Sequence, residues 1–348
     1  MSDPLTPLAN RADAGTLAVP SPGLGLIEGF VADGQGGAVP LAPNELAANP
    51  LMNPPSGGYL WLHFAMEAAR GWVPANLDLD EDTLRALFAD ETRPRCTHRR
   101  GAVLMNLRGV NLNEGQALED MVSLRIHLRP GRLITVRRQK SVAVEEIRLE
   151  MRGGVAPRDP ATLLLRITAG LTDRIEPVVD ALADRIDAYE ELSIMGQAAD
   201  LRADLSAMRH DAIVFRRYVA PQREAVARFA ANDAHLLPDE ALSAAKEEAD
   251  RVTRVVEELD IIRERAAVIY EQIAARRADE MNRNMMIISV VSAVFLPLGF
   301  LTGLLGINVG GMPGAENDAA FWFVCGLCVA LGAALLVVFR RMGWLSRS

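Results

Sequence analysis

Two long uncharged runs occupy the C-terminal end of the chain. No charged side chain lies between Arg283 and Glu316, and residues 285–306 are almost entirely apolar. A second apolar run covers residues 319–339 and ends at two arginines. A helix needs about 20 such residues to cross a hydrocarbon core of about 30 Å. The pattern therefore predicts transmembrane helices over 285–306 and 319–339.

Basic side chains flank the two runs at their outer ends, and none lies in the connection between them. The predicted connection, residues 307–318, contains no Lys or Arg. Three arginines precede the first run and three follow the second: Arg276, Arg277, Arg283, Arg340, Arg341 and Arg347. The positive-inside rule then predicts that both termini are cytoplasmic, that 307–318 is periplasmic and that 340–348 is a basic cytoplasmic tail.

The chain before these runs has a mixed pattern. Residues 23–150 alternate short apolar runs with turn residues, which is typical of an α/β domain, and residues 80–89 predict an amphipathic helix. The runs that predict strands are 25–31, 58–64, 102–107, 123–128 and 132–137. The first 20 residues hold three prolines and no apolar stretch, so we expect residues 1–22 to be a flexible tail rather than a signal peptide.

The pattern becomes helical after residue 150. The region 151–238 predicts a hairpin of two helices near 159–195 and 200–233, interrupted at Gly196. From Asp239 to Leu296 there is neither Gly nor Pro. We therefore expect a stalk helix over 239–284 that continues without a break into the first transmembrane helix.

Two stripes follow this long helix at alternating steps of three and four residues. The first is apolar and predicts packing against other helices: Val252, Val255, Leu259, Ile262, Ala266, Ile269 and Ile273. The second lies on another face, and its members at membrane depth are small, polar or flexible: Asn282, Met285, Ser289, Ser292, Leu296 and Gly299. Such a stripe has two interpretations, a close helix–helix interface or the lining of a water-filled path.

Composition narrows the classes of function. The 348 residues carry 37 Lys+Arg and 45 Asp+Glu, a net charge of −8, which argues against nucleic acid as the partner. Three cysteines cannot form a disulfide framework. Residues 23–150 contain no phosphate-binding loop, GxSxG or GxGxxG motif, so the sequence predicts no enzyme and no catalytic residue.

Other residues that bind metals elsewhere have simpler explanations here. Cys325 and Cys328 lie inside an apolar helix, so we expect both to be small packing residues and not metal ligands. The five histidines show no metal-binding spacing. The acidic stalk residues alternate with arginines and predict a solvated helix face: Glu247, Glu248, Glu257, Glu258, Asp260 and Glu264.

The end of the first apolar run carries a resemblance. Residues 295–308 read Phe-Leu-Pro-Leu-Gly-Phe-Leu-Thr-Gly-Leu-Leu-Gly-Ile-Asn, and Val-Gly-Gly-Met-Pro-Gly follows. This segment, placed before a last apolar helix with a basic end, resembles the CorA superfamily of divalent-cation transporters. That family has Gly-Met-Asn here, whereas this chain has Gly306, Ile307 and Asn308. The Gly-Ile-Asn form is similar to the ZntB branch, described as zinc transporters.

The resemblance implies an assembly that composition does not show. It implies an α+β membrane protein that forms a funnel-shaped homopentamer in the bacterial inner membrane, with the first transmembrane helix of five copies around a pore. The stripe from Asn282 to Gly299 would then line the pore, and Gly306, Ile307 and Asn308 would form the selectivity motif. The cargo would be a divalent cation, Zn²⁺ before Mg²⁺, Co²⁺ or Ni²⁺, and no cofactor is expected.

The residue types at the pore entrance suggest how it would act. A ring of Asn308 amides is neutral and would hold a cation through its water shell. Glu316 and Asp318 would attract cations from outside, while Leu296 and Met285 would form apolar constrictions. The alternative function is a membrane-anchored scaffold or sensor without transport, which leaves the Gly-Ile-Asn motif unexplained.

Overall fold

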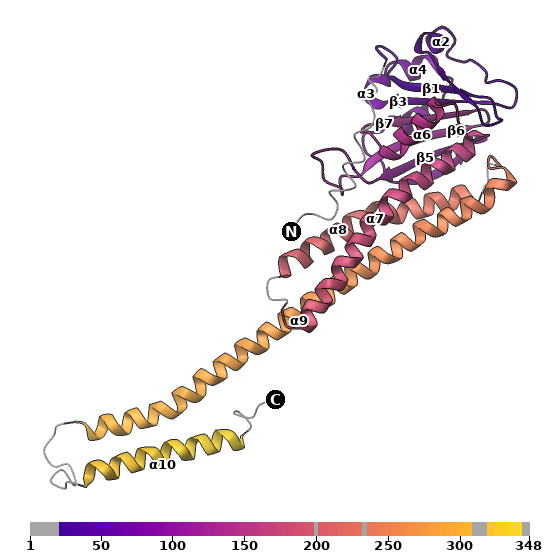
Figure 1. The fold of residues 1–348 in the computed structure, drawn as a ribbon. Helices are drawn as coiled ribbons and strands as arrows, with labels where there is room; N and C mark the ends of the chain where they lie inside the picture. The colour runs from indigo at the N-terminus through magenta and orange to yellow at the C-terminus, as the bar shows by residue number, and fades with distance from the viewer. Residues whose placement is uncertain (1–20, 198–200, 232–234, 308–318, 343–348) are drawn as a thin grey trace. The chain divides into compact units, whose positions relative to one another are not determined.

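The structure is a computed structural model that describes residues 21–197, 201–231, 235–307 and 319–342. The chain divides into two compact units, Met1–Tyr270 and Glu271–Ser348. The first holds a β-sheet with its covering helices and a helical bundle, and the second holds two apolar helical segments (Figure 1). The predicted order of elements is confirmed: an N-terminal α/β domain, a helical hairpin, a very long helix and a last apolar helix.

A seven-stranded sheet forms the centre of the first unit, in the order β2-β1-β3-β7-β6-β5-β4. Only the central β3–β7 pair is parallel, and every other neighbouring pair is antiparallel. The strands are β1 (Leu26–Ala32), β2 (Ala38–Leu41), β3 (Tyr59–Ala65), β4 (Arg95–Arg99), β5 (Ala102–Gly109), β6 (Val122–Arg129) and β7 (Arg132–Arg137). All five predicted strands are confirmed, and β2 and β4 are additional edge strands.

The two faces of the sheet have different covers. Leu62 and Phe64 of β3 and Ile134 and Val136 of β7 point to one face, where they form a core with short helices. These helices are α2 (Pro43–Ala48), α3 (Met66–Ala69), α4 (Trp72–Asn76) and α5 (Glu81–Leu87). The opposite face is covered by α6 (Val142–Arg152) and by the start of α7 (Pro160–Ile194). The predicted helix at 80–89 is α5, whose first turn is capped by the Asp80 carboxylate.

Three long helices complete the first unit. They are α7, α8 (Arg202–Ala230) and the part of α9 (Asp239–Leu305) that lies before residue 271. The predicted hairpin segments 159–195 and 200–233 correspond to α7 and α8. The predicted apolar seam of α9 is confirmed, because its seven residues are at most 5% exposed. The first unit runs to Tyr270 without a division. The predicted boundaries after residue 150 (end of the α/β domain) and after residue 238 (start of the stalk) therefore stay predictions from the sequence.

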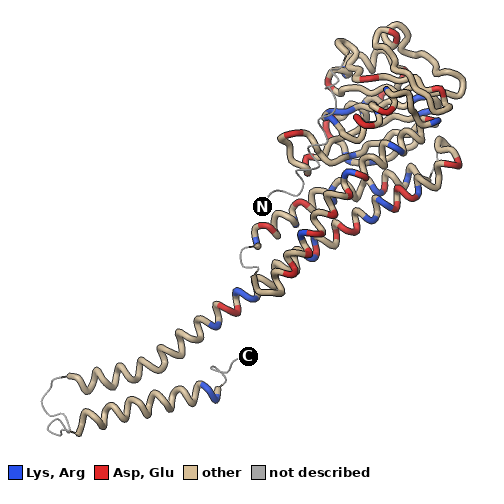
Figure 2. Tube along the Cα trace, in the orientation of Figure 1, with Lys and Arg blue, Asp and Glu red and all other residues tan. Residues whose placement is uncertain are grey.

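The second unit contains the two candidate membrane spans. α9 continues as one helix through Pro297 to Leu305, and α10 (Ala320–Arg341) follows. Both are long and apolar enough to cross a membrane. Beyond Arg283, the described part of this unit carries no charge until the last turn of α10 (Figure 2). The predicted spans 285–306 and 319–339 lie on these helical segments.

Two glycines before β1 give a matched test of this packing. Gly23 and Gly25 both have a left-handed φ, +80° and +68°, but only Gly25 lies against another segment, where a Cβ would be 2.3 Å from the Ala69 nitrogen. We expect Gly23→Ala to cost about 1 kcal/mol in folding free energy from backbone strain. Gly25→Ala should cost about 3 kcal/mol or more, because the backbone of α3 has to move. Thermal unfolding of both variants measures the difference, and equal melting temperatures would contradict it.

Candidate functional site

The last helix covers one side of the membrane part of α9. Val290 of α9 is 5% exposed, and the side chain of Leu298 reaches the surface of Gly332 on α10. Other α9 residues on this side are half-buried: Val294, Pro297, Leu298 and Leu301. They recur at helical spacing, so α10 packs along a single face of α9.

The predicted pore-lining stripe lies on the other side. At 100° per residue, its mean direction is roughly 160° around the helix axis from that of the residues that face α10. All six members, Asn282 to Gly299, are exposed in the single chain, and Leu296 is 78% exposed. The hydroxyl of Ser289 donates to the Met285 carbonyl at 2.8 Å, so its polarity is satisfied within the helix. The stripe is thus one free face, available to another helix or to water.

The predicted selectivity motif begins where α9 ends. Gly306 N–H donates to the carbonyls of Thr302 (2.9 Å) and Gly303 (3.2 Å), which closes the last turn, and Ile307 follows as an exposed residue. Asn308, Glu316 and Asp318 lie outside the described residues. The motif therefore follows directly on the helix that carries the exposed stripe.

The other metal-binding residue types have structural roles. Cys325 and Cys328 lie on the half-buried side of α10 together with Gly332, in agreement with the packing interpretation. Among the described residues there is no group of three His, Cys, Asp or Glu side chains that could hold a metal ion. His63 is fully buried beside Thr135, with 2.7 Å between Nδ1 and Oγ1, and burial lowers its pKa well below 6.5. It is a neutral core histidine.

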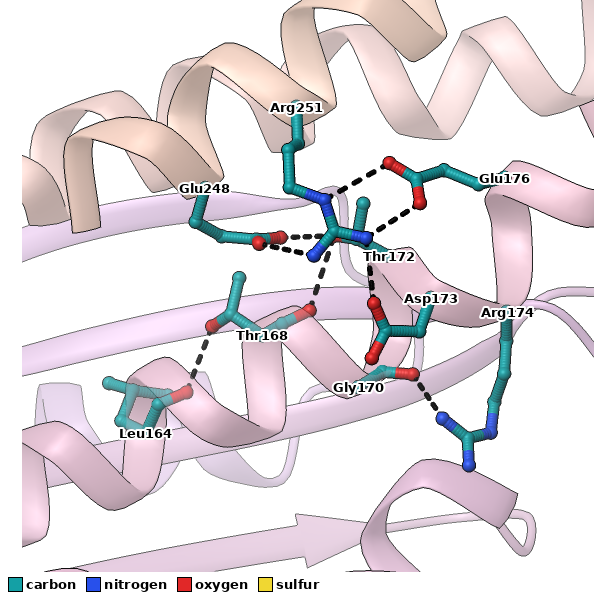
Figure 3. A network of polar contacts seen from close by, with 9 residues as sticks. All are labelled: Leu164, Thr168, Gly170, Thr172, Asp173, Arg174, Glu176, Glu248 and Arg251. Atoms are coloured by element: carbon teal, nitrogen blue, oxygen red, sulfur yellow. Dashed lines mark hydrogen bonds and ion pairs between the residues drawn. The ribbon is translucent and has the colours of Figure 1, made fainter. Parts of the chain in front are cut away.

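Within the first unit, α9 and α7 are joined by two sets of ion pairs that follow the same pattern. The Arg251 guanidinium donates to Asp173 Oδ1 (2.7 Å) and to Glu176 Oε2 (2.6 Å) of α7 (Figure 3). Fourteen residues later on both helices, the same pattern returns, and Arg265 pairs with Asp187 and Glu190. Because the partners advance together along both helices, α7 and α9 run parallel. Arg216 of α8 pairs with Asp260 of α9 at 2.6 Å, on the third helix of the bundle.

A carboxyl group is buried inside this helix interface. Glu248 was predicted on a solvated face, and this prediction is wrong: its residue is 3% exposed and falls at a step of the apolar seam between Ala245 and Val252. It accepts hydrogen bonds from the Thr172 hydroxyl and from Arg251 Nη1, the latter at 3.1 Å (Figure 3). The three-and-four spacing of the seam was the signal that could have revealed its burial.

The environment of Glu248 resists its negative charge. Burial raises the pKa of this carboxyl above its ordinary value of 4.5, while the Thr172 hydrogen bond and the Arg251 charge act in the opposite direction. The folded state therefore holds this proton more tightly than the unfolded chain. Its contribution to stability is complete below pH 4.5 and is lost as the pH rises through the folded pKa.

The positions 14 residues after Glu248 and Thr172 are occupied by Ile262 and Ile186, and both are fully buried.

Residues 56–341 match the family described as "CorA-like Mg2+ transporter protein". That match covers strands β3 to β7 of the sheet, the bundle and both apolar helices, and it begins after β1 and β2. The chain belongs to the CorA family. A divalent cation transporter named CmaX from Pseudomonas aeruginosa is 36% identical over 329 residues, which are 92% of this chain and 97% of that protein.

Further relatives agree with this assignment. The zinc transport protein ZntB of Pectobacterium atrosepticum is 30% identical over 321 residues, 92% of this chain and 96% of that protein. A solved structure of full-length CmaX superposes with a TM-score of 0.78 at 34% identity, covering 95% of this chain and 100% of that chain. This CorA-family chain is a divalent-cation transporter and a membrane protein, not an enzyme, and the predicted resemblance to the CorA family is confirmed.

The buried polar pair of this CorA-family chain gives a double-mutant test. Thr172→Ile alone should destabilise the full chain by about 1–3 kcal/mol, because the buried Glu248 carboxyl loses a hydrogen-bond donor. Thr172→Ile with Glu248→Ile recreates the isoleucine pair found two heptads later and should be at least as stable as the natural chain. Thermal unfolding in detergent measures all four members of the cycle.

The control for this cycle is the neighbouring exposed carboxylate. Glu247→Ile should change stability by less than about 0.5 kcal/mol, because Glu247 is exposed. Strictly additive effects of the two core substitutions would show that Thr172 and Glu248 do not depend on each other.

Proposed function

We propose that this CorA-family transporter moves hydrated divalent cations, Zn²⁺ in preference to Mg²⁺, Co²⁺ or Ni²⁺, through an axial pore. Five copies of the chain would surround the pore, each contributing the membrane half of α9. The observation that carries the proposal is the exposed stripe on α9, which lies on the side away from α10. A face left free by the chain's own last helix can be shared by symmetry-related copies.

The polarity of the stripe supports a water-filled path over a purely apolar contact. Asn282, Ser289 and Ser292 are polar, and Gly299 exposes backbone. Leu296 and Met285 lie on the same face and would form apolar rings that close by excluding water. Between Asn282 and Gly299 the stripe contains no Asp, Glu, His or Cys, so a tetrahedral zinc site at this depth is unsupported. The ion would pass with its water shell.

Selection would occur at the outer end of the pore. Five Asn308 amides would present carbonyl dipoles to the first-shell waters of the cation, since neutral oxygens do not strip a divalent ion easily. Glu316 and Asp318 would raise the local cation concentration outside this ring. The preference for zinc is supported by the Gly306-Ile307-Asn308 form and by the name of the ZntB relatives.

The distribution of arginines supports the orientation. Those flanking the two spans would keep both termini in the cytoplasm, with residues 307–318 in the periplasm of a bacterial inner membrane. No cofactor is needed for this function, because the transported cation supplies the only metal. The first unit would then form the cytoplasmic part of a funnel.

The assembly has a direct test. The mass of the detergent-solubilised protein, measured by light scattering or native mass spectrometry, should correspond to five copies. A monomer or dimer as the sole species would refute the pore.

A second experiment distinguishes direct contact of Asn308 with the hydrated cation from long-range attraction by Glu316 and Asp318. Asn308→Ala should abolish Zn²⁺ and Co²⁺ flux into proteoliposomes while the mass of the assembly stays unchanged. The double variant Glu316→Gln with Asp318→Asn should lower flux mainly at low salt, because attraction between exposed charges is screened over about 10 Å at 0.1 M. A salt series measures both variants. Normal flux in Asn308→Ala would exclude the role proposed for this residue.

A further inference from the structure

A polar cavity of about 800 Å³ lies in the first unit, at one edge of the region where α8 meets the sheet. Its walls come from residues 90–93 before β4, from Arg108 of β5 and Ser123 of β6, and from Arg138 after β7 and Tyr218 of α8. Strands, a loop and a helix far apart in sequence therefore converge on it. Nothing in cation transport through α9 uses this cavity.

Arginine is the dominant residue of the cavity. Four arginines line it: Arg93, Arg108, Arg138 and Arg217. A fifth, Arg125, is 1% exposed and lies directly behind Ser123, to whose Oγ it donates at 2.6 Å. The acidic residues of the wall are Asp90 and Glu91, and Asp90 is already paired with Arg70 at 2.5 Å. In a chain of net charge −8, this is a local excess of positive charge.

The two inner arginines are held by neutral groups. Arg108 donates to the carbonyls of Met121 and Thr92, both at 2.8 Å. Arg125 donates to the Ala89 carbonyl at 2.8 Å in addition to Ser123. The Nε atoms of Arg108 and Arg125 are buried without a hydrogen-bond partner, and within the described part of the chain neither guanidinium forms an ion pair. Their positions are fixed, but their charges are not neutralised.

Electrostatics at this place favours an added negative charge. Burial, together with the nearby charges of Arg108 and Arg138, lowers the pKa of Arg125 to about 10, although Asp90 acts in the opposite direction. Burial likewise lowers the pKa of Arg108, with a contribution from Arg217. An anion in the cavity would offset the repulsion among these guanidinium groups, whereas a cation would add to it.

The donor set fits phosphate oxygens. Guanidinium groups bind phosphate through paired N–H donors. Tyr218 accepts a hydrogen bond from Arg217 at 2.9 Å, so its own hydroxyl proton can donate to a ligand, and the Ser123 hydroxyl is in the same situation. The volume is larger than one phosphate requires and lies in the range of pockets that hold nucleotide-sized molecules.

We propose that this cavity binds a soluble polyphosphate-bearing small molecule of nucleotide size. Its phosphates would lie against Arg108, Arg138 and Arg217, and the ligand would bridge α8 to strands β5 and β6. Because α8 is also paired with α9 through Arg216 and Asp260, ligand binding would act on the bundle from which α9 extends.

The test measures binding to the purified full chain in detergent by calorimetry. The probes are ADP and pyrophosphate at fixed ionic strength, with divalent cations chelated so that metal transport plays no part. ADP should bind saturably and raise the melting temperature. Arg217→Gln and Arg138→Gln, both exposed in the free protein, should each weaken binding about tenfold or more, and Arg217→Lys should restore only part of it.

The matched control is Arg254→Gln, which removes an exposed arginine of α9 outside the cavity and should leave ADP affinity unchanged. No saturable ADP binding, or an equal loss in Arg254→Gln, would overturn the site. Binding of pyrophosphate without binding of ADP would overturn the argument from size. Because cations are absent, failure of this test leaves the flux experiments on Asn308 unaffected.

Discussion

A helix that passes from water into lipid must satisfy its backbone hydrogen bonds internally, and α9 is continuous over 67 residues, with Pro297 as the one residue that has no N–H to donate. The sequence makes this possible by excluding Gly and Pro from 239 to 296. Polar side chains in the apolar part follow the same requirement, because Thr302 donates its hydroxyl to the Leu298 and Gly299 carbonyls just after Pro297. Helices α7 and α8 pair with α9 in the first unit, and α10 packs on it in the second.

Residues spaced three and four apart along α9 lie on the same face, so different sets of residues can contact different surroundings. In the first unit its apolar seam packs into the bundle with α7 and α8. In the second unit the face around Val290 and Leu298 meets α10, and the small and polar face is left uncovered. The change from charged to uncharged surface along α9 in Figure 2 marks where the surrounding solvent changes.

The sequence patterns predicted the helices and strands better than they predicted which segments pack together. Long apolar runs and the 239–296 stretch have few alternative structures, so the spans and α9 were predictable. The edge strands β2 and β4 were missed, because β2 contains Pro40 and β4 buries only Cys96 of its five residues. Glu248 was misjudged because charge suggests solvent, although its helical position placed it in the seam. The arginine cavity was invisible, since five separate segments build it.

The repeated ion pairs between α7 and α9 have a consequence for alignment. If α9 slid by 14 residues, about 21 Å, Arg251 would meet Asp187 and Glu190 and regain equivalent partners. Arg265 would then lie beyond the end of α7 at Ile194 and lose its partners, so charge pairing disfavours this slip without excluding it. The slipped alignment would place Glu248 against Ile186, a buried carboxyl without a hydroxyl donor, which costs several kcal/mol. The Thr172–Glu248 pair thus adds specificity to the alignment of the two helices, because its hydrogen bond forms only in the observed register.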